Sequence, residues 1–238
     1  SISTITATIS DEFGNRITDA TNSITFTING VGTLDGTNPV NAVNGVATIK
    51  MKSTTLAGGA TVQASASGLS SGNAFVNTVA GEKVKVVCSA EPVSVTADVG
   101  ISTITARIAD QYGNTVEDAT DLVTFSITGE GTWKDGKTDN RDVNAVGGIA
   151  TIALKSTTQA GTITVTATAT GLTQGTTQVM TVAGPKTQII NSAEPTSIKA
   201  NGVSISTITA KIADQYGNTV TDATDMITFI VEGEGTLE

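Results

Sequence analysis

The stretch ISTITATISDEFGNRITDAT at residues 2–21 decides the fold, because the chain contains it three times in closely related forms. It recurs as ISTITARIADQYGNTVEDAT at residues 101–120 and as ISTITAKIADQYGNTVTDAT at residues 205–224. The copies begin at Ile2, Ile101 and Ile205, which are 99 and 104 residues apart. A period of about 100 residues is a domain length and is too long for one unit of a solenoid. The sequence therefore predicts a chain of repeated modules.

Further matches continue the repeat beyond this stretch. ITFTINGVGTL at residues 24–34 matches VTFSITGEGTW at 123–133 and ITFIVEGEGTL at 227–237, and GVATIKMKSTTLAG at 45–58 matches GIATIALKSTTQAG at 148–161. From this register we predict three modules: module 1 at residues 1–84, module 2 at residues 85–185 and module 3 at residues 186–238.

Modules 2 and 3 each begin with a lead-in segment that contains proline. These segments span residues 85–100 and 186–204, and they include CSAEP from Cys88 and NSAEP from Asn191. Nothing equivalent precedes Ser1, and the sequence stops at Glu238, about halfway through the third repeat. We therefore expect module 1 to lack its first strand, module 2 to be complete and module 3 to contain only its N-terminal half.

Apolar and polar residues alternate in the repeated stretches, as expected for strands with one buried face. The alternation is clear at residues 5–9 and 24–28 of module 1 and at residues 104–108 and 123–127 of module 2. Aromatic residues are only 3% of the chain, so small β-branched side chains must fill the cores. With turn residues at intervals of about ten residues, the predicted fold class is all-β, with tandem immunoglobulin-like β-sandwich modules.

The motif Asp-x-x-Gly-Asn begins at Asp11, Asp110 and Asp214. An aspartate at the first position of a turn can accept backbone hydrogen bonds, and a glycine at the fourth supplies a positive φ. We interpret the motif as a turn and assign it no catalytic or metal-binding role.

The composition excludes several classes of function. The net charge is −9 with only 13 Lys and Arg residues, so the chain has no basic surface for nucleic acid or anionic lipid. It has one cysteine and no histidine, which removes an intramolecular disulfide, the usual zinc sites and histidine-based catalysis. No apolar run is long enough to span a bilayer, and residues 1–20 do not resemble a signal peptide. We expect no enzyme activity, no catalytic residue, no binding of nucleic acid and no membrane insertion.

The order of the motifs resembles one family. Thr-Ile-Thr-Ala, D-x-x-G-N-x-[IV], T-F-x-[IV], G-[VI]-A-T-[IV] and TVAG follow one another as in the bacterial Ig-like domain group 1, the repeat of invasin- and intimin-type surface proteins. The resemblance covers module 1, module 2 and half of module 3. It implies an extracellular or cell-surface stalk that carries a tip domain or assembles into a filament or surface layer. It also implies that any receptor, on a host or another cell, is bound by modules outside this chain.

Two single residues are candidate sites, and for both we favour a structural interpretation. Cys88 aligns with Asn191 in the next repeat, so the fold does not require a thiol there, although an intermolecular disulfide is conceivable. Trp133 aligns with Leu34 and Leu237, which indicates a packing residue at a strand end, whereas a sugar-binding aromatic would need neighbours of its kind.

Acidic residues cluster at residues 117–121 and at Asp135, Asp139 and Asp142, without the spacing of a known calcium loop. We interpret both clusters as solvated surface and expect no metal or other cofactor. Calcium at the module junctions is the one cofactor that merits a test, because four oxygen-bearing residues flank the lead-in prolines: Glu91, Asp98, Glu194 and Asn201.

Three functions remain open. The first is a structural spacer, as an adhesin stalk or a filament or surface-layer subunit, because similar modules repeat along the chain. The second is a ligand- or receptor-binding module that uses the longer loop at residues 134–146, where the repeats differ most. The third is an accessory spacer of a secreted enzyme. Open strand edges in the incomplete modules also predict self-association into a filament or lattice, besides contacts between neighbouring modules of one chain.

Overall fold

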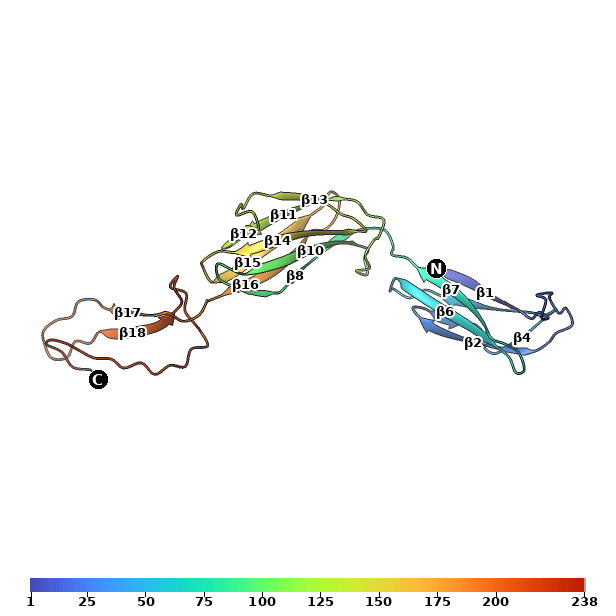
Figure 1. Ribbon diagram of the computed structural model, residues 1–238, viewed down its shortest axis with the longest axis horizontal. Coiled ribbons are helices and arrows are strands. Elements are labelled where there is room, and N and C mark those ends of the chain that lie inside the picture. Colours follow the sequence, from blue (N-terminus) through green and yellow to red (C-terminus); the bar gives the residue numbers. More distant parts are fainter. Residues whose placement is uncertain (238) are drawn as a thin grey trace.

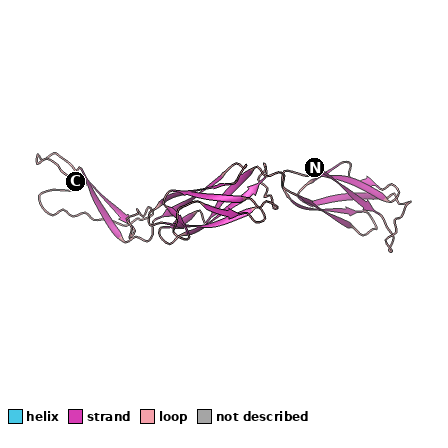
Figure 2. Ribbon diagram, turned by 90° about the horizontal axis from the view of Figure 1, so that it is seen from above, coloured by secondary structure: helices cyan, strands magenta, loops and turns pink. Residues whose placement is uncertain are grey.

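The computed structural model describes residues 1–237, which fold into strands and connecting loops without any helix. It follows that no helix in this range is available to cross a membrane. Figures 1 and 2 show three units in a row, with module 2 in the middle and the chain extended along one axis. Among residues 1–237, no strand of one module pairs with a strand of another. The predicted all-β class with Ig-like sandwich modules is confirmed.

Module 2 is a two-layer sandwich. Its strands are β8 (Lys85–Glu91), β9 (Ser94–Thr96), β10 (Ile101–Ala109), β11 (Leu122–Thr128), β12 (Gly131–Trp133), β13 (Arg141–Asn144), β14 (Ile149–Ser156), β15 (Gly161–Thr168) and β16 (Gly175–Val182). One sheet has the order β12-β14-β10-β8, and the other has the order β13-β11-β15-β16-β9. The lead-in segment therefore contributes a strand to each sheet: β8 pairs with β10, and β9 pairs in parallel with β16.

Module 1 has the same arrangement without the two lead-in strands. It consists of β1 (Ile2–Thr8), β2 (Ser23–Gly30), β3 (Thr33–Asp35), β4 (Val40–Asn41), β5 (Val46–Lys52), β6 (Gly58–Ser65) and β7 (Gly72–Thr78). Its sheets have the orders β1-β5-β3 and β4-β2-β6-β7. Within the described residues, β1 and β7 are thus edge strands, whereas their counterparts β10 and β16 are interior ones.

Module 3 contains one hairpin, β17 (Gln188–Glu194) paired with β18 (Thr207–Ala213). Residues 227–237 match the stretches that form β2 and β3 in module 1 and β11 and β12 in module 2, but in module 3 this segment has no strand. The reason is that β11 is held by pairing to β13 and β15, and the chain contains no counterpart of β15 in module 3.

The core of module 2 combines small aliphatic side chains with one aromatic pair. Phe125 on β11 and Trp133 on β12 are both buried, with ring centroids 6.4 Å apart and ring planes at 75°. The indole Nε1 of Trp133 donates a hydrogen bond to the carbonyl oxygen of Asp139 at 2.7 Å. An edge-to-face pair with a satisfied indole is a stable core arrangement. Trp133 is therefore a packing residue, as its alignment with leucines predicted.

The packing of Leu154 in this core gives a testable prediction. Leu154 is fully buried on β14 opposite Trp133, so Leu154→Ala should lower the unfolding free energy of module 2 by about 2–5 kcal/mol through lost burial and a cavity. Trp133 is the only tryptophan, so its fluorescence during urea titration reports on module 2.

The matched control is Met51→Ala, which removes the equivalent buried side chain from module 1. Met51→Ala should leave the urea concentration at the midpoint of the Trp133 fluorescence transition unchanged. Equal shifts of that transition in the two variants would contradict the independence of the two cores.

Candidate functional site: the junctions between modules

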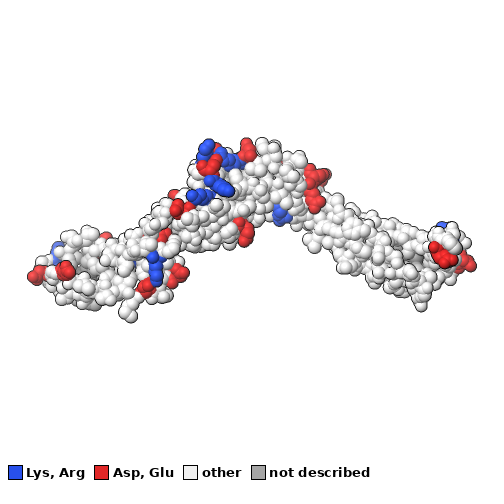
Figure 3. Space-filling view, in the orientation of Figure 1, with Lys and Arg blue, Asp and Glu red and all other residues white. Residues whose placement is uncertain are grey.

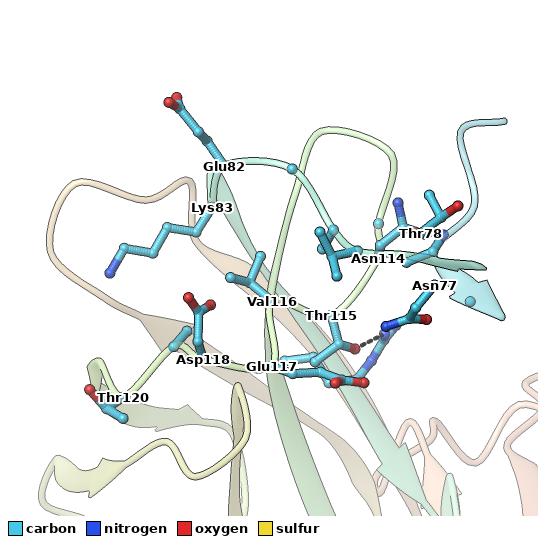
Figure 4. Close-up of a pocket in the computed structure, with 18 residues that line it drawn as sticks. Asn77, Thr78, Glu82, Lys83, Asn114, Thr115, Val116, Glu117, Asp118 and Thr120 are labelled. Carbon is cyan, nitrogen blue, oxygen red and sulfur yellow. Dashed lines mark hydrogen bonds between the residues drawn. The ribbon is translucent and has the colours of Figure 1, made fainter. Parts of the chain in front are cut away.

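The modules meet at two junctions that are built from the same elements. At the first, the loop between β5 and β6 and the segment between β7 and β8 face the turn that follows β10. Figure 4 shows this region, with Asn77 and Thr78 from β7 beside Asn114 in the turn. Since no sheet continues across the junction, contacts between these loops determine how one module sits on the next.

The turn after β10 is ordered by the carboxylate of Asp110. Its Oδ1 accepts hydrogen bonds from the backbone N–H groups of Tyr112 and Asn114, both at 2.9 Å, and its Oδ2 accepts one from Asn114 Nδ2 at 2.8 Å. Gly113 has a φ of +91°, which residues with a Cβ rarely adopt. The predicted Asp-x-x-Gly-Asn turn is confirmed, and the same carboxylate geometry is present at Asp11 and Asp214.

Asn114 connects this turn to module 1. Its Nδ2 donates to the carbonyl oxygen of Thr55 at 2.8 Å, and its Oδ1 accepts from the backbone N–H of Ala57 at 2.9 Å. Asp110 Oδ2 also accepts from the backbone N–H of Gly81 at 2.9 Å. One amide side chain thus pairs with the main chain of the neighbouring module as a donor and an acceptor at once. We call these five residues the first junction clamp.

The second junction repeats every one of these contacts. Asn218 Nδ2 donates to Thr158 O at 2.7 Å, the N–H of Ala160 donates to Asn218 Oδ1 at 2.8 Å, and the N–H of Gly184 donates to Asp214 Oδ2 at 2.9 Å. We call this set the second junction clamp. The residues that form the two clamps are the same in both repeats, so the clamp is a property of the repeat.

The second junction has one additional contact. The hydroxyl of Tyr216 donates to Asp98 Oδ2 at 2.7 Å, and this bond, with the Asp98 charge, raises the pKa of Tyr216. Asp98 lies in the lead-in segment of module 2, where its φ is +72°. Tyr112, the counterpart in the first junction, is 58% exposed. The lead-in segment of one module therefore supports the next junction along the chain.

Hydrogen bonding keeps the clamp carboxylates ionised. The amide of Asn114 and three backbone N–H groups lower the pKa of Asp110 to about 2, against the opposing effect of burial. At Asp214, burial raises the pKa, but the combined hydrogen bonds from Asn218, Gly184 and Tyr216 outweigh it and bring the pKa to about 2. Bonds that favour the charged form of a carboxyl group have this effect.

An open groove lies beside the first clamp, between modules 1 and 2 (Figure 4). Its charged lining residues include Glu82, Lys83, Glu117 and Asp118, and Lys83 forms an ion pair with Asp121 at 2.7 Å. None of the described lining residues is aromatic, so the groove lacks the stacking surface that sugar sites use. Figure 3 shows Lys, Arg, Asp and Glu side chains spread in small groups along the visible face, without a basic surface.

The structure places Cys88 on β8 in contact with the core of module 2. Burial raises the pKa of its thiol to about 11, so it is protonated at neutral pH and a weak nucleophile. The conceivable intermolecular disulfide at Cys88 stays a prediction.

The three aspartates singled out in the longer loop of module 2 have protein partners. Arg141 pairs with Asp135 at 2.6 Å and with Asp139 at 2.5 Å, and Asp142 accepts a hydrogen bond from Thr124. These contacts fasten the loop between β12 and β13 to the sandwich.

The four residues proposed for junction calcium are not assembled into one site. Asp98 is bonded to Tyr216, while Asn201 Oδ1 accepts backbone bonds within its own loop. Glu91 and Glu194 lie at the ends of β8 and β17. Residues 1–237 contain no group of three or more Asp, Glu, Cys or His side chains arranged to hold a metal ion. Junction calcium stays a prediction.

The clamp itself was not anticipated from the sequence. A turn requires Asp and Gly but not the following Asn, and nothing in a turn requires the Thr-Thr-x-Ala-Gly of residues 54–58 and 157–161. The joint recurrence of Asn114 and Asn218 with these two loops was the available signal.

The pKa of Asp110 gives a prediction for acid. A carboxyl group with a depressed native pKa stabilises the fold above its unfolded pKa of 3.8, and this stabilisation is lost as the pH falls through about 2. The wild type should therefore lose thermal stability between about pH 4 and about pH 2 more steeply than Asp110→Asn, as measured by calorimetry. Parallel pH profiles of the two proteins would contradict the assignment.

Comparison with known proteins connects the chain to an enzyme-associated family. The family model for glycoside hydrolase family 2 C-terminal domain 5 matches residues 1–74, 87–178 and 189–238, with one segment in each module. No curated protein matches the sequence significantly.

Several solved structures are similar in fold. A glycosyl hydrolase family 2 member from Bacteroides cellulosilyticus has a TM-score of 0.42 and 20% identity over 69% of this chain, which spans 22% of that protein. The Escherichia coli adhesin FdeC has a TM-score of 0.43 and 21% identity, covering 93% of this chain and 71% of that one. Invasin, a bacterial integrin-binding protein, has a TM-score of 0.40 and 22% identity, covering 93% and 48%.

The family model that matches is not that of bacterial Ig-like domain group 1, so that particular assignment stays a prediction. The matched segments include most of the residues in all three modules. The chain belongs to the glycoside hydrolase family 2 C-terminal domain 5 family.

Proposed function

We propose that this chain is a non-catalytic spacer, a rod of Ig-like modules that holds the parts of a larger protein at a fixed separation and orientation. The observation that carries the proposal is the junction clamp, which occurs with the same hydrogen bonds at both junctions. Flexible linkers between domains need no such contacts, whereas a rod needs them at every joint.

The clamp is suited to restrain bending because its parts are ordered before the modules meet. The Asp110 carboxylate fixes the turn, so Asn114 loses little side-chain freedom on docking. Each neutral hydrogen bond contributes about 1 kcal/mol, and bonds to the ionised carboxylate contribute more. Next to the clamp, Lys83 and Lys186 pair with Asp121 and Asp225 and fasten each connecting segment to the following module.

The larger protein has two candidate forms. Family membership favours an accessory segment of a glycoside hydrolase, which would hold the catalytic domain away from its neighbours. The tandem repetition favours a stalk at the cell surface or outside the cell, with receptor binding by modules beyond this chain. Assembly into a filament or surface layer belongs to this second form.

A binding role for the loop between β12 and β13 is supported by its order. The N–H of Trp133 donates to Lys137 O at 2.8 Å, and Arg141 bridges Asp135 and Asp139. The loop is thus a fixed, charged surface on the side of the rod, and its deletion would test recognition separately from the spacer role.

Replacing Asn114 tests the spacer function. Spin labels at Thr48→Cys and Thr151→Cys, equivalent exposed positions on β5 and β14, report the distance between modules 1 and 2 in a Cys88→Ser background. With the unmodified junction, double electron–electron resonance should give one narrow distribution of the distance between the two labels. Asn114→Ala should broaden it and weaken docking by about 1–2 kcal/mol, because it removes two hydrogen bonds across the junction.

Asn15→Ala is the matched control, because it alters the same turn in module 1, where the structure shows no neighbouring module. The distribution should then stay narrow. A broad distribution in the parent protein, or a narrow one in Asn114→Ala, would refute a clamped rod.

A further inference from the structure

Module 1 carries a second half-built junction at its far end. The Asp11 turn has the clamp geometry: Asp11 Oδ1 accepts from the N–H groups of Phe13 and Asn15 at 3.0 and 2.8 Å, and Asn15 Nδ2 donates to Asp11 Oδ2 at 3.0 Å. Both Asp11 and Asn15 are exposed, whereas Asp110 and Asp214 are 2% and 1% exposed. Phe13, in the position of Tyr112, is 81% exposed.

One side of module 1, between β1 and β7, is open where β8 covers the equivalent side of module 2. In module 2, strand β8 lies between the equivalent strands and covers Ala106 and Val179, which are both fully buried. Their counterparts Ala7 and Val76 are only half-buried. We call the line between β1 and β7 the open seam of module 1.

A glycine beside the open seam indicates that the seam can accommodate the backbone of a strand. A Cβ on Gly175 of β16 would lie 2.6 Å from Val86 O and 3.0 Å from Cys88 N, so only glycine lets the β8 backbone pass. Its counterpart Gly72 has no atom within 4 Å of a Cβ position and no positive φ. Nothing in module 1 requires glycine at this position, but a strand placed like β8 would require it.

We propose that the open seam and the Asp11 turn together form a docking surface for a further module of the same family, joined in tandem through a lead-in strand of the β8 type. The strand would bring small apolar side chains at alternate positions, as Val86, Cys88 and Ala90 do in module 2. The docked module would present a Thr-Thr-x-Ala-Gly loop to Asn15. The proposal rests on the spacer function and extends it by naming the partner.

A second copy of this chain does not fit the surface. Its loops at residues 54–58 and 157–161 are already bonded to Asn114 and Asn218, and β8 and β17 are already paired. A tandem module offers a free loop, and linkage in one chain makes docking intramolecular, so a few hydrogen bonds suffice.

A tandem fusion tests the proposal. Residues 1–100 are placed directly before Ile2 of the chain, with Cys88→Ser in both copies, which keeps the repeat spacing of 99 residues and the glycine at position 100, where a Cβ would clash with Val95 Cβ. Hydrogen exchange of the β1 amides in the original module 1 should slow on the order of tenfold, because the lead-in strand covers their edge. With spin labels at Thr48→Cys in both copies, Asn15→Ala in the original copy should now broaden the distance distribution.

Gly72→Ala in the original copy is the discriminating variant. It should leave the unextended chain unchanged and abolish the slowed exchange in the fusion, since its methyl group would meet the added backbone. The proposal would be overturned if the β1 amides exchanged as fast in the fusion as in the unextended chain. It would also be overturned if Asn15→Ala failed to broaden the distance distribution in the fusion. Concentration-dependent self-association of the unextended chain with protection of β1 and β7 would overturn it in favour of a second copy. None of these outcomes alters the Asn114→Ala result, so the spacer function is judged separately.

Discussion

The arrangement of the modules depends on one amide side chain that an ionised carboxylate holds in position. Asn114 and Asn218 each pair with the main chain of the preceding module, and Asp110 and Asp214 orient them while accepting a further N–H from it. Because the same carboxylate orders the turn and crosses the junction, folding of a module and docking of its neighbour are coupled. A joint of this kind is formed by backbone groups, so neighbouring modules can differ in most side chains and still fit.

The lead-in segment of module 2 adds a strand to each layer of the sandwich. In module 2, β8 covers the side of the core and β9 extends the second sheet, and interior residues such as Ile104 and Val179 are fully buried. Asp98 of the same segment reaches Tyr216 at the next junction. The lead-in thus links the stability of one module to its orientation on the next.

The family membership and the architecture are both compatible with the proposed spacer role. The matched family is named for a C-terminal domain of glycoside hydrolases, and a rod with clamped joints would keep an attached domain at a defined distance. A stalk of surface-protein type would use the same mechanics. Both proposals give this chain the role of a spacer that sets the distance and orientation of other domains.

The sequence by itself determined the all-β class, the strand alternation, the turns at Asp11, Asp110 and Asp214, and the interior position of Trp133. These features follow from local periodicity, from turn chemistry and from comparison between repeats, all of which can be read along one chain. Residues 227–237 resemble strand-forming stretches of the other modules but form no strand, because a strand needs a partner, which is a non-local condition. Only the tertiary structure showed that Asn114 bonds across a junction and that Gly72 faces open space. The first depends on the backbone of Thr55, which is distant from Asn114 in the sequence. The second is seen only by comparison with Gly175, which packs against β8 in module 2.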